Sequence, residues 1–290
     1  MASLVRRGLV IAGAAILLLI LVGATYQGVA TALERRRFPH QGRLIDVGGH
    51  QLHLRCTGAG TPTVVLEAPA ATMSAVWARV QNTVAATTRT CSYDRAGLGW
   101  SEAGDAPFSP QEAAPQLHEL LTKADERGPF IVAGAEFGAA LARLYVSRYP
   151  GEIAALVLID VPGASVTGAA ETPSARFLAF APWLARTGAL RVARTWSSSV
   201  RGLPEPAAGE LRSFLNRPDH LARASNELSS WDRTVALSDA APLPRDLGLL
   251  QVEVEGRNRI GLLADARNAG DVSDAIVRAV RRARSTVRGN

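Results

Sequence analysis

The first forty residues have a hydrophobic pattern unlike that of the rest of the chain. No charged residue interrupts residues 8–33, and residues 9–22 are almost wholly aliphatic. A helix of about 20 apolar residues is long enough to cross the hydrocarbon core of a bilayer. The pattern predicts a transmembrane anchor at residues 8–33 after a short amino-terminal segment at residues 1–7. The arginines on both sides of the span do not settle its orientation. A cleaved secretory signal with a small-residue site at Ala30–Ala32 is the alternative, but the apolar stretch exceeds the usual length of a signal core.

Beyond the anchor, apolar residues occur in short runs separated by polar turns. The run Pro129–Ala133 is short and apolar, as is typical of a buried strand, whereas Ala139–Tyr149 carries apolar residues near one face, as is typical of a helix. Strands and helices alternate from residue 64 to residue 162, which is the pattern of a parallel sheet with crossover helices. Residues 163–235 break the alternation and predict amphipathic helices. The chain therefore predicts one α/β domain over residues 34–290 with a helical insertion.

Composition and charge narrow the possible functions. With 290 residues and 47% hydrophobic content, the chain can bury the core of a full domain. The net charge of +6 comes from scattered basic residues, and Lys123 is the only lysine among them. Basic runs at Arg35–Arg37 and Arg278–Arg284 are typical of charge beside a membrane or on an ordinary surface. Since no recognition motif accompanies the charge, we expect no nucleic-acid partner, and no pattern predicts a cofactor.

A turn flanked by glycines joins the predicted strand to the predicted helix. It has the sequence Gly134-Ala135-Glu136-Phe137-Gly138, which matches a G-x-S-x-G nucleophile elbow except that glutamate stands in the serine position. In such an elbow the central residue adopts strained backbone angles, and the glycines let helix and strand approach closely. A solvated glutamate at a helix amino terminus, favoured by the helix dipole, is the simpler alternative.

Several segments together resemble the α/β-hydrolase family, in particular its bacterial members with an amino-terminal hydrophobic anchor. The resemblance covers residues 40–162 well and residues 250–283 loosely. It rests on the glycine-flanked turn and on four further segments, the third of which is the most specific: Val47–Gly58, Val64–Ala68, Cys91–Ser101 and Leu156–Asp160. The resemblance implies an α/β-hydrolase fold with a mostly parallel sheet, flanking helices and a helical cap at about residues 163–235.

The catalytic residues of the family are replaced in this chain. The nucleophile position holds Glu136, which has no hydroxyl group to activate. The family's catalytic histidine follows the last strand, which we place at Ile260–Ala264, and Asp271 then stands at the histidine position. No histidine occurs after His220 in the sequence. With two members of the triad replaced, ordinary serine-hydrolase chemistry is not expected, because the triad acts as a unit.

The resemblance also implies an oxyanion hole made by two backbone N–H groups. The first belongs to Phe137. The second belongs to Ala70, in a loop where Pro69 replaces the usual glycine and removes one N–H. The acid of the triad stays unassigned, because residues 239–258 show no clear pattern of a strand followed by an acid.

These residues leave three functional hypotheses. We favour a non-catalytic, membrane-anchored pseudoenzyme that uses the inherited pocket for an apolar small-molecule ligand, or its surface for a protein partner. The second is a lyase, isomerase or cyclase in which Glu136 is the acid or base, with burial and the Asp271 carboxylate favouring its protonated form. The third is a hydrolase with an unrecognised nucleophile. Two carboxylates are too few oxygen ligands to predict a metal site.

The family's sheet would make the strands that carry Cys56 and Cys91 antiparallel neighbours. The resemblance therefore implies a disulfide between the only two cysteines, and with it an oxidising compartment outside the cytoplasm. Two buried free thiols are the alternative. We therefore expect a single-pass protein of the cell membrane, with a short cytoplasmic amino terminus at residues 1–7, lipid around its anchor and the domain on the extracytoplasmic side.

The remaining notable side chains are expected to be structural. Residues 177–184 of the cap contain phenylalanines and Trp183, which we expect to pack the cap onto the sheet, although an apolar ligand site or a membrane surface would also suit them. His220 is expected at the surface of the cap. Asp94 and Arg95 are expected to form a hydrogen-bonded pair that supports the loops near the pocket.

Overall fold

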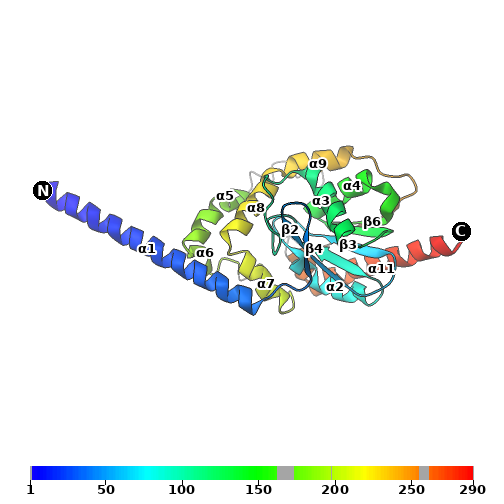
Figure 1. Ribbon diagram of the computed structural model, residues 1–290, viewed down its shortest axis with the longest axis horizontal. Coiled ribbons are helices and arrows are strands. Elements are labelled where there is room, and N and C mark those ends of the chain that lie inside the picture. Colours follow the sequence, from blue (N-terminus) through cyan, green and yellow to red (C-terminus); the bar gives the residue numbers. More distant parts are fainter. Residues whose placement is uncertain (1, 162–172, 197, 255–260, 290) are drawn as a thin grey trace.

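A seven-stranded sheet lies at the centre of the domain (Figure 1). The structure is a computed structural model and describes residues 2–161, 173–196, 198–254 and 261–289. The strand order is β1-β2-β4-β3-β5-β6-β7, in which the β1–β2 and β2–β4 pairs are antiparallel and the other pairs are parallel. The prediction of a mostly parallel sheet is confirmed. The strands are β1 (Arg43–Asp46), β2 (Gln51–Thr57), β3 (Thr63–Glu67), β4 (Thr90–Tyr93), β5 (Phe130–Ala135), β6 (Ile153–Ile159) and β7 (Gly248–Val252).

Helices cover both faces of the sheet. Val64 and Leu66 of β3 belong to one core cluster, whereas Val65 between them belongs to another. Because both faces are buried, the central strands are apolar at successive positions rather than at alternate ones. The first cluster is covered by α2 (Ala78–Ala85) and α11 (Ala266–Gly289), and the second by α3 (Pro110–Lys123) and α4 (Phe137–Arg148).

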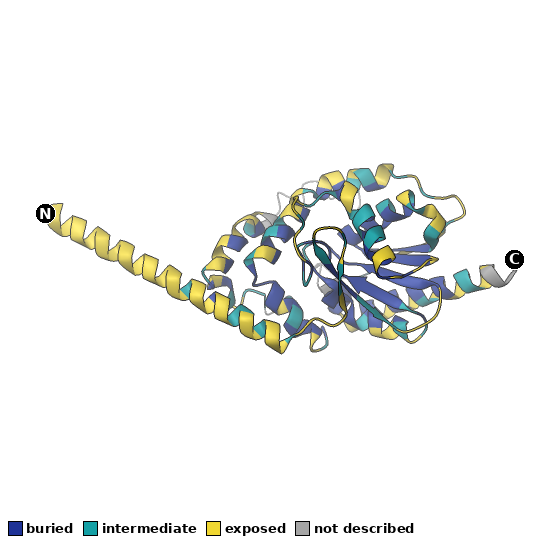
Figure 2. Cartoon of the chain, in the orientation of Figure 1, coloured by how far each residue is buried: buried dark blue, intermediate teal, exposed yellow. Residues whose placement is uncertain are grey.

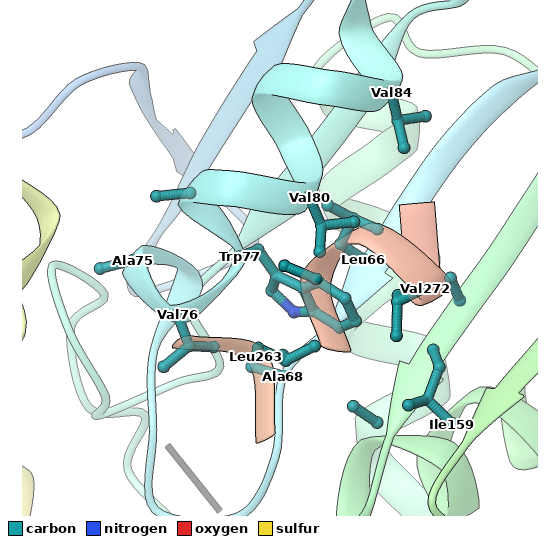
Figure 3. Packing of buried hydrophobic residues seen from close by; sticks show 14 of the residues in the cluster. Leu66, Ala68, Ala75, Val76, Trp77, Val80, Val84, Ile159, Leu263 and Val272 are labelled. Carbon is teal, nitrogen blue, oxygen red and sulfur yellow. The ribbon is translucent and has the colours of Figure 1, made fainter. Parts of the chain in front are cut away.

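Trp77 is the largest fully buried side chain of the first cluster. It comes from a short 3-10 helix, η1 (Ser74–Trp77), and lies beside Leu66, Val80 and Val272 (Figure 3). A second 3-10 helix, η2 (Pro150–Glu152), leads into β6. The packing of a strand, α2 and α11 around one indole joins the early and late parts of the chain into one core.

The cap lies between β6 and β7. Its described part contains the helices α5 (Pro173–Arg186), α6 (Ala189–Val192), α7 (Ala207–Phe214), α8 (Pro218–Ser229) and α9 (Trp231–Ala240). The helical insertion is therefore present, and its helices continue to Ala240, beyond the expected end at residue 235. Its expected first residues, 163–172, lie outside the described part of the chain.

The anchor segment forms one continuous helix, α1 (Ala2–Arg37), that projects from the domain (Figures 1 and 2). It is long and apolar enough to cross a membrane, and its most apolar stretch is 0% buried. Only its carboxyl-terminal part contacts the domain, where Gln27 is buried and donates a hydrogen bond of 2.7 Å to the carbonyl of Asn216. Burial therefore does not account for the apolar character of residues 8–22, which is typical of a membrane span or a signal sequence.

The last part of the chain differs from the prediction. Residues 260–264 were expected to form the last strand, but Gly261–Ala264 is a short helix, α10, and the last strand of the described chain is β7. A short apolar run does not distinguish a strand from a buried helical turn by its periodicity. Asp271 consequently does not follow a strand, and it lies on the exposed side of α11. Ile260 lies outside the described residues.

The predicted disulfide joins β2 to β4. Cys56 lies directly opposite Cys91 in the strand register, and their Sγ atoms are 2.05 Å apart. Within the described residues, the one cluster of side chains close enough together to hold a metal ion consists of these two cysteines and Glu126. Since sulfur in a disulfide is not the thiolate that a metal requires, the disulfide explains this cluster without a metal.

Candidate functional site

Glu136 stands at a sharp turn between β5 and α4. Its backbone angles are φ 53° and ψ −119°, a conformation that is unusual for a residue with a side chain. The two glycines of the turn are sterically required. A Cβ atom on Gly134 would lie 2.3 Å from the carbonyl oxygen of Gly138, and one on Gly138 would lie 2.4 Å from the carbonyl oxygen of Glu67. The helix thus packs directly on the backbone of two strands, which is the geometry of a nucleophile elbow.

The carboxylate of Glu136 is hydrogen-bonded to both N–H groups that the sequence assigns to the oxyanion hole. Its Oε2 atom accepts from the N–H of Ala70 at 3.0 Å and from the N–H of Phe137 at 3.3 Å. Ala70 and Phe137 are both fully buried. The structure therefore brings these three predicted residues together, with Oε2 of Glu136 at the point where the two donors converge.

Arg95 holds the loop that carries Ala70. Its guanidinium group contacts Glu67 Oε1 at 2.7 Å and Glu227 Oε1 at 2.6 Å, and it donates to the carbonyl of Pro69 at 3.0 Å. The second oxygen of Glu227 accepts from the N–H of Ala71 at 2.8 Å. Because Glu227 belongs to α8, this buried network joins the loop to the cap.

The charges of this network are strongly coupled. Burial raises the pKa of Glu67, although Arg95 and a hydrogen bond from Tyr93 oppose that effect. Burial and then the nearby Glu67 raise the pKa of Tyr93 well above its ordinary value, so the tyrosine stays a neutral donor. Burial alone would lower the pKa of Arg95, but Glu227, Glu67 and Tyr93 together raise it above its ordinary value. One arginine therefore compensates two buried carboxyl groups, which is a structural role.

Asp94 pairs with His53 rather than with Arg95, so the expected pairing of Asp94 and Arg95 is wrong. His53 Nδ1 lies 3.0 Å from Asp94 Oδ2, and both side chains are buried. Asp94 also accepts hydrogen bonds from the backbone N–H groups of Ser74 and Trp100. Adjacent residues in an extended segment point in opposite directions, which separates the two side chains. Asp94 thus organises the loop from Arg95 to Ser101.

His220 is buried at 1% exposure, so its expected surface position is wrong. Its Nδ1 atom accepts from the N–H of Gly99 at 3.1 Å. Burial lowers the pKa of His220 to about 4, and the imidazole is therefore neutral at physiological pH. The hydrogen bond between His220 and Gly99 depends on how α8 packs against a loop that is distant in the sequence, so no local sequence pattern predicts it.

Two acidic residues at the ends of neighbouring strands were not singled out from the sequence. Asp160 directly follows β6, which pairs with β5, the strand that leads to Glu136. Glu253 directly follows β7, which pairs with the other side of β6. Burial and then Glu253 raise the pKa of Asp160. An acid that directly follows a strand is a pattern that could have identified Glu253 from the sequence, but β7 was not predicted as a strand. Glu136, Asp160 and Glu253 thus lie at the carboxyl ends of three successive strands of the sheet, and Asp271 lies elsewhere, on the exposed side of α11.

Comparison with known proteins begins with sequence. No family model matches this chain. It is 26% identical over 157 residues to the protein YbdG of Bacillus subtilis, a match that covers 51% of this chain and 46% of that protein. It is 35% identical over 92 residues to an AB hydrolase superfamily protein of Gibberella zeae, covering 31% of this chain and 28% of that protein. The chain spans less than half the length of the curated relatives that it matches.

Solved structures match over most of the chain. The Cif epoxide hydrolase of Acinetobacter nosocomialis superimposes with a TM-score of 0.67 at 13% identity, over 89% of this chain and 96% of that one. A thermophilic esterase of Thermogutta terrifontis gives 0.61 at 17% identity, over 84% and 99%. An alpha/beta hydrolase fold protein of Burkholderia ambifaria gives 0.61 at 18% identity, over 81% and 99%. The chain therefore has the α/β-hydrolase fold.

Proposed function

We propose that this protein is a membrane-anchored protein of α/β-hydrolase fold that does not hydrolyse esters and instead binds a ligand or a partner. One observation carries the proposal: the carboxylate of Glu136 accepts hydrogen bonds from the N–H groups of Ala70 and Phe137. In a hydrolase such donors stabilise the negative charge that develops in the transition state. In this protein an oxygen of the protein's own Glu136 side chain is bound to them.

The chemistry of acyl transfer lacks its other parts as well. Glu136 offers no alkoxide, and the sequence has no histidine after His220. His220 itself belongs to the cap and accepts a hydrogen bond from Gly99. A substrate carbonyl directed at the two N–H groups would approach an anion, which repels the developing oxyanion rather than stabilising it.

The hypothesis of an acid–base enzyme is less well supported. Two N–H donors favour the ionised form of a carboxyl group, whereas a proton donor has to hold its proton near neutral pH. The expected partner, Asp271, lies on α11 and is exposed. A lyase, isomerase or cyclase that uses Glu136 is therefore the second hypothesis, and the variants described below test it.

The cap supports the proposed membrane attachment. Phe180 and Trp183 of α5 are 68% and 70% exposed, and Val192 of α6 is 72% exposed. The expectation that the aromatic residues of this segment are packing residues fits the partly buried Phe177, which packs against buried residues of the cap and of α4, but not Phe180 and Trp183. Aromatic side chains are enriched where a protein meets the interface of a bilayer. Since α5 also contacts α1, we infer that this side of the cap faces the membrane surface.

The activity test uses the full-length protein in detergent with p-nitrophenyl esters and a fluorophosphonate probe. We expect hydrolysis at the rate of the buffer and no labelling of the wild-type protein. Glu136→Ser should remain inactive, because no imidazole is present to activate the hydroxyl group.

A matched pair of variants separates the alternatives. Glu136→Gln removes the charge at the elbow, and Glu112→Gln removes an exposed charge on α3 as a control. Hydrolysis by the wild-type protein that disappears in Glu136→Gln and persists in Glu112→Gln would contradict the proposal. A cellular phenotype that is lost in Glu136→Gln and kept in Glu112→Gln, in a protein that hydrolyses no ester, would favour the acid–base enzyme.

A further inference from the structure

A groove of about 590 Å³ lies between the anchor helix and the cap. Helix α1 contributes Gln27, Thr31 and Arg35 to its lining. The cap contributes Arg186 at the end of α5, and Arg217 and Asp219 at the start of α8. The groove is therefore bounded by the part of α1 that docks on the domain and by the basic edge of the cap.

Arg217 carries buried hydrogen-bond donors that have no acceptor within the described residues. The residue is 3% exposed, and its Nε and Nη2 atoms are buried without a hydrogen-bond partner. Its Cζ atom lies 3.6 Å from the ring centroid of Phe214 and 5.4 Å from that of Trp100. Stacking satisfies the faces of a guanidinium group but not its N–H edge. A buried cation with free donors marks a site for an anion.

The charges around Arg217 have the sign that suits an anion. Burial and then repulsion from Arg35 lower the pKa of Arg217 to about 10. Three arginines line the groove against one aspartate, Asp219, which leaves an excess of two positive charges. Glu34 also acts on Arg217, but it is engaged in a salt bridge with Arg191. An anion in the groove would relieve the repulsion between neighbouring arginines.

The start of α8 adds a second kind of anion recognition. Arg217 is the N-cap residue, Pro218 is the first residue of the helix, and no side chain caps the first turn. The first N–H groups of a helix have no partner within the helix, and the helix dipole adds partial positive charge at this end. Phosphate groups bind at helix amino termini for this reason.

We propose that this groove binds a phosphate group, carried either by an acidic phospholipid or by a free phosphate. A guanidinium edge with a neighbouring helix amino terminus provides the donors that phosphate oxygens accept. This site is separate from the elbow at Glu136, and the proposal does not depend on whether that elbow is catalytic.

The position of the groove along α1 favours the phospholipid. Residues 8–22 rise only about 22 Å as a helix, and a hydrocarbon core is about 30 Å thick. The span therefore has to continue to about Gln27, where the helix already contacts the cap. The groove then lies at the level of the headgroups, and its Arg186 stacks on the exposed Trp183. This argument depends on the proposed anchor, whereas binding of a free phosphate does not.

The test uses the full-length protein in neutral detergent. Native mass spectrometry measures retention of dioleoyl phosphatidylglycerol against dioleoyl phosphatidylcholine, and thermal unfolding measures stabilisation by inorganic phosphate against chloride at equal ionic strength. We expect the wild-type protein to retain phosphatidylglycerol about tenfold better than phosphatidylcholine. Both lipids carry a phosphate, but the choline cation of phosphatidylcholine would add a like charge to a groove with an excess of two positive charges. Arg217→Gln and Arg186→Gln should abolish this preference, and Arg127→Gln, which removes an exposed charge elsewhere, should preserve it.

The outcomes distinguish a phospholipid headgroup from free phosphate as the ligand of the groove. A preference for phosphatidylglycerol that both groove variants lose identifies a lipid site. Stabilisation by inorganic phosphate without lipid preference, lost in the same variants, identifies a site for a free phosphate. Arg186 is exposed, so its variant is informative even if Arg217→Gln does not fold. Equal retention of both lipids with no effect of phosphate, or binding that Arg186→Gln leaves intact, would overturn the proposal.

Discussion

The backbone of Glu136 has an unfavourable conformation, and hydrogen bonds of its own side chain stabilise it. A positive φ at a residue other than glycine lowers the stability of the folded state by about 1–3 kcal/mol. Glu136 adopts φ 53°, and its carboxylate returns to the N–H group of the next residue and to that of Ala70. Hydrogen bonds from a backbone N–H to a carboxylate are stronger than those between neutral groups. The glutamate therefore serves the turn itself, and this role needs no substrate.

The buried pair of His53 and Asp94 makes stability depend on pH. Burial alone would lower the pKa of His53, but Asp94, the carbonyl of Gln41 and Glu210 together raise it above 6.5. Burial alone would raise the pKa of Asp94, but His53 and the hydrogen bonds from Trp100 and Ser74 together lower it below 3.8. The contribution of His53 to the free energy of unfolding is complete below the pKa of histidine in the unfolded chain. It is lost as the pH rises through the higher pKa of His53 in the folded protein. The aspartate contribution is lost only as the pH falls through its lowered pKa.

We expect the free energy of unfolding of the wild-type protein to fall between pH 6 and pH 8.5, as about one bound proton is released. His53→Gln should remove this component of the pH dependence. His118→Gln is the control, because that histidine is 34% exposed and lies beside Glu152 at the surface. Urea unfolding followed by tryptophan fluorescence measures each variant at both pH values. An unchanged pH dependence in His53→Gln would show that the pair does not titrate in this range.

At the scale of the elements, the contact of α4 with the sheet depends on two glycines. A Cβ atom on Gly138 would meet the carbonyl oxygen of Glu67 at 2.4 Å, which leaves no room for a methyl group. We expect Gly138→Ala to lower the free energy of unfolding by at least about 2 kcal/mol, because helix and strand would have to separate. Gly151→Ala is the matched control, since a Cβ atom there meets nothing within 4 Å. Equal stability of the two variants, measured by urea unfolding, would contradict this packing.

The elements that the sequence predicts well are those with a local signal. The glycines around Glu136 and the apolar runs of β3 and β5 are visible as patterns. The short segment at residues 261–264 was assigned to the wrong class, because four apolar residues suit a strand and a helical turn equally. The burial of His220 and the contact of Arg95 with Glu227 depend on how the cap meets the sheet. Such contacts join residues more than 100 positions apart and leave no periodic trace.

At the scale of the whole molecule, the disulfide and the anchor make one joint prediction. We expect the full-length protein to remain in the membrane fraction after alkaline carbonate, and Cys56 and Cys91 to react with maleimide only after reduction. Replacing both cysteines by serine should cost about 2–4 kcal/mol of stability, because the crosslink restricts the unfolded chain. Release into the soluble fraction would indicate a cleaved signal, and thiols that react without reduction would place the domain in a reducing compartment.

The unbroken course of α1 has a mechanical consequence. The helix runs from Ala2 to Arg37, and its last part is held to the cap through Gln27 and through the salt bridge of Glu34 with Arg191. In a membrane no hinge would then separate the span from the domain, so the two would tilt as one body. A helix tilts more in a thin bilayer than in a thick one. The thickness of the surrounding lipid would thereby set the angle at which the whole domain leans over the surface.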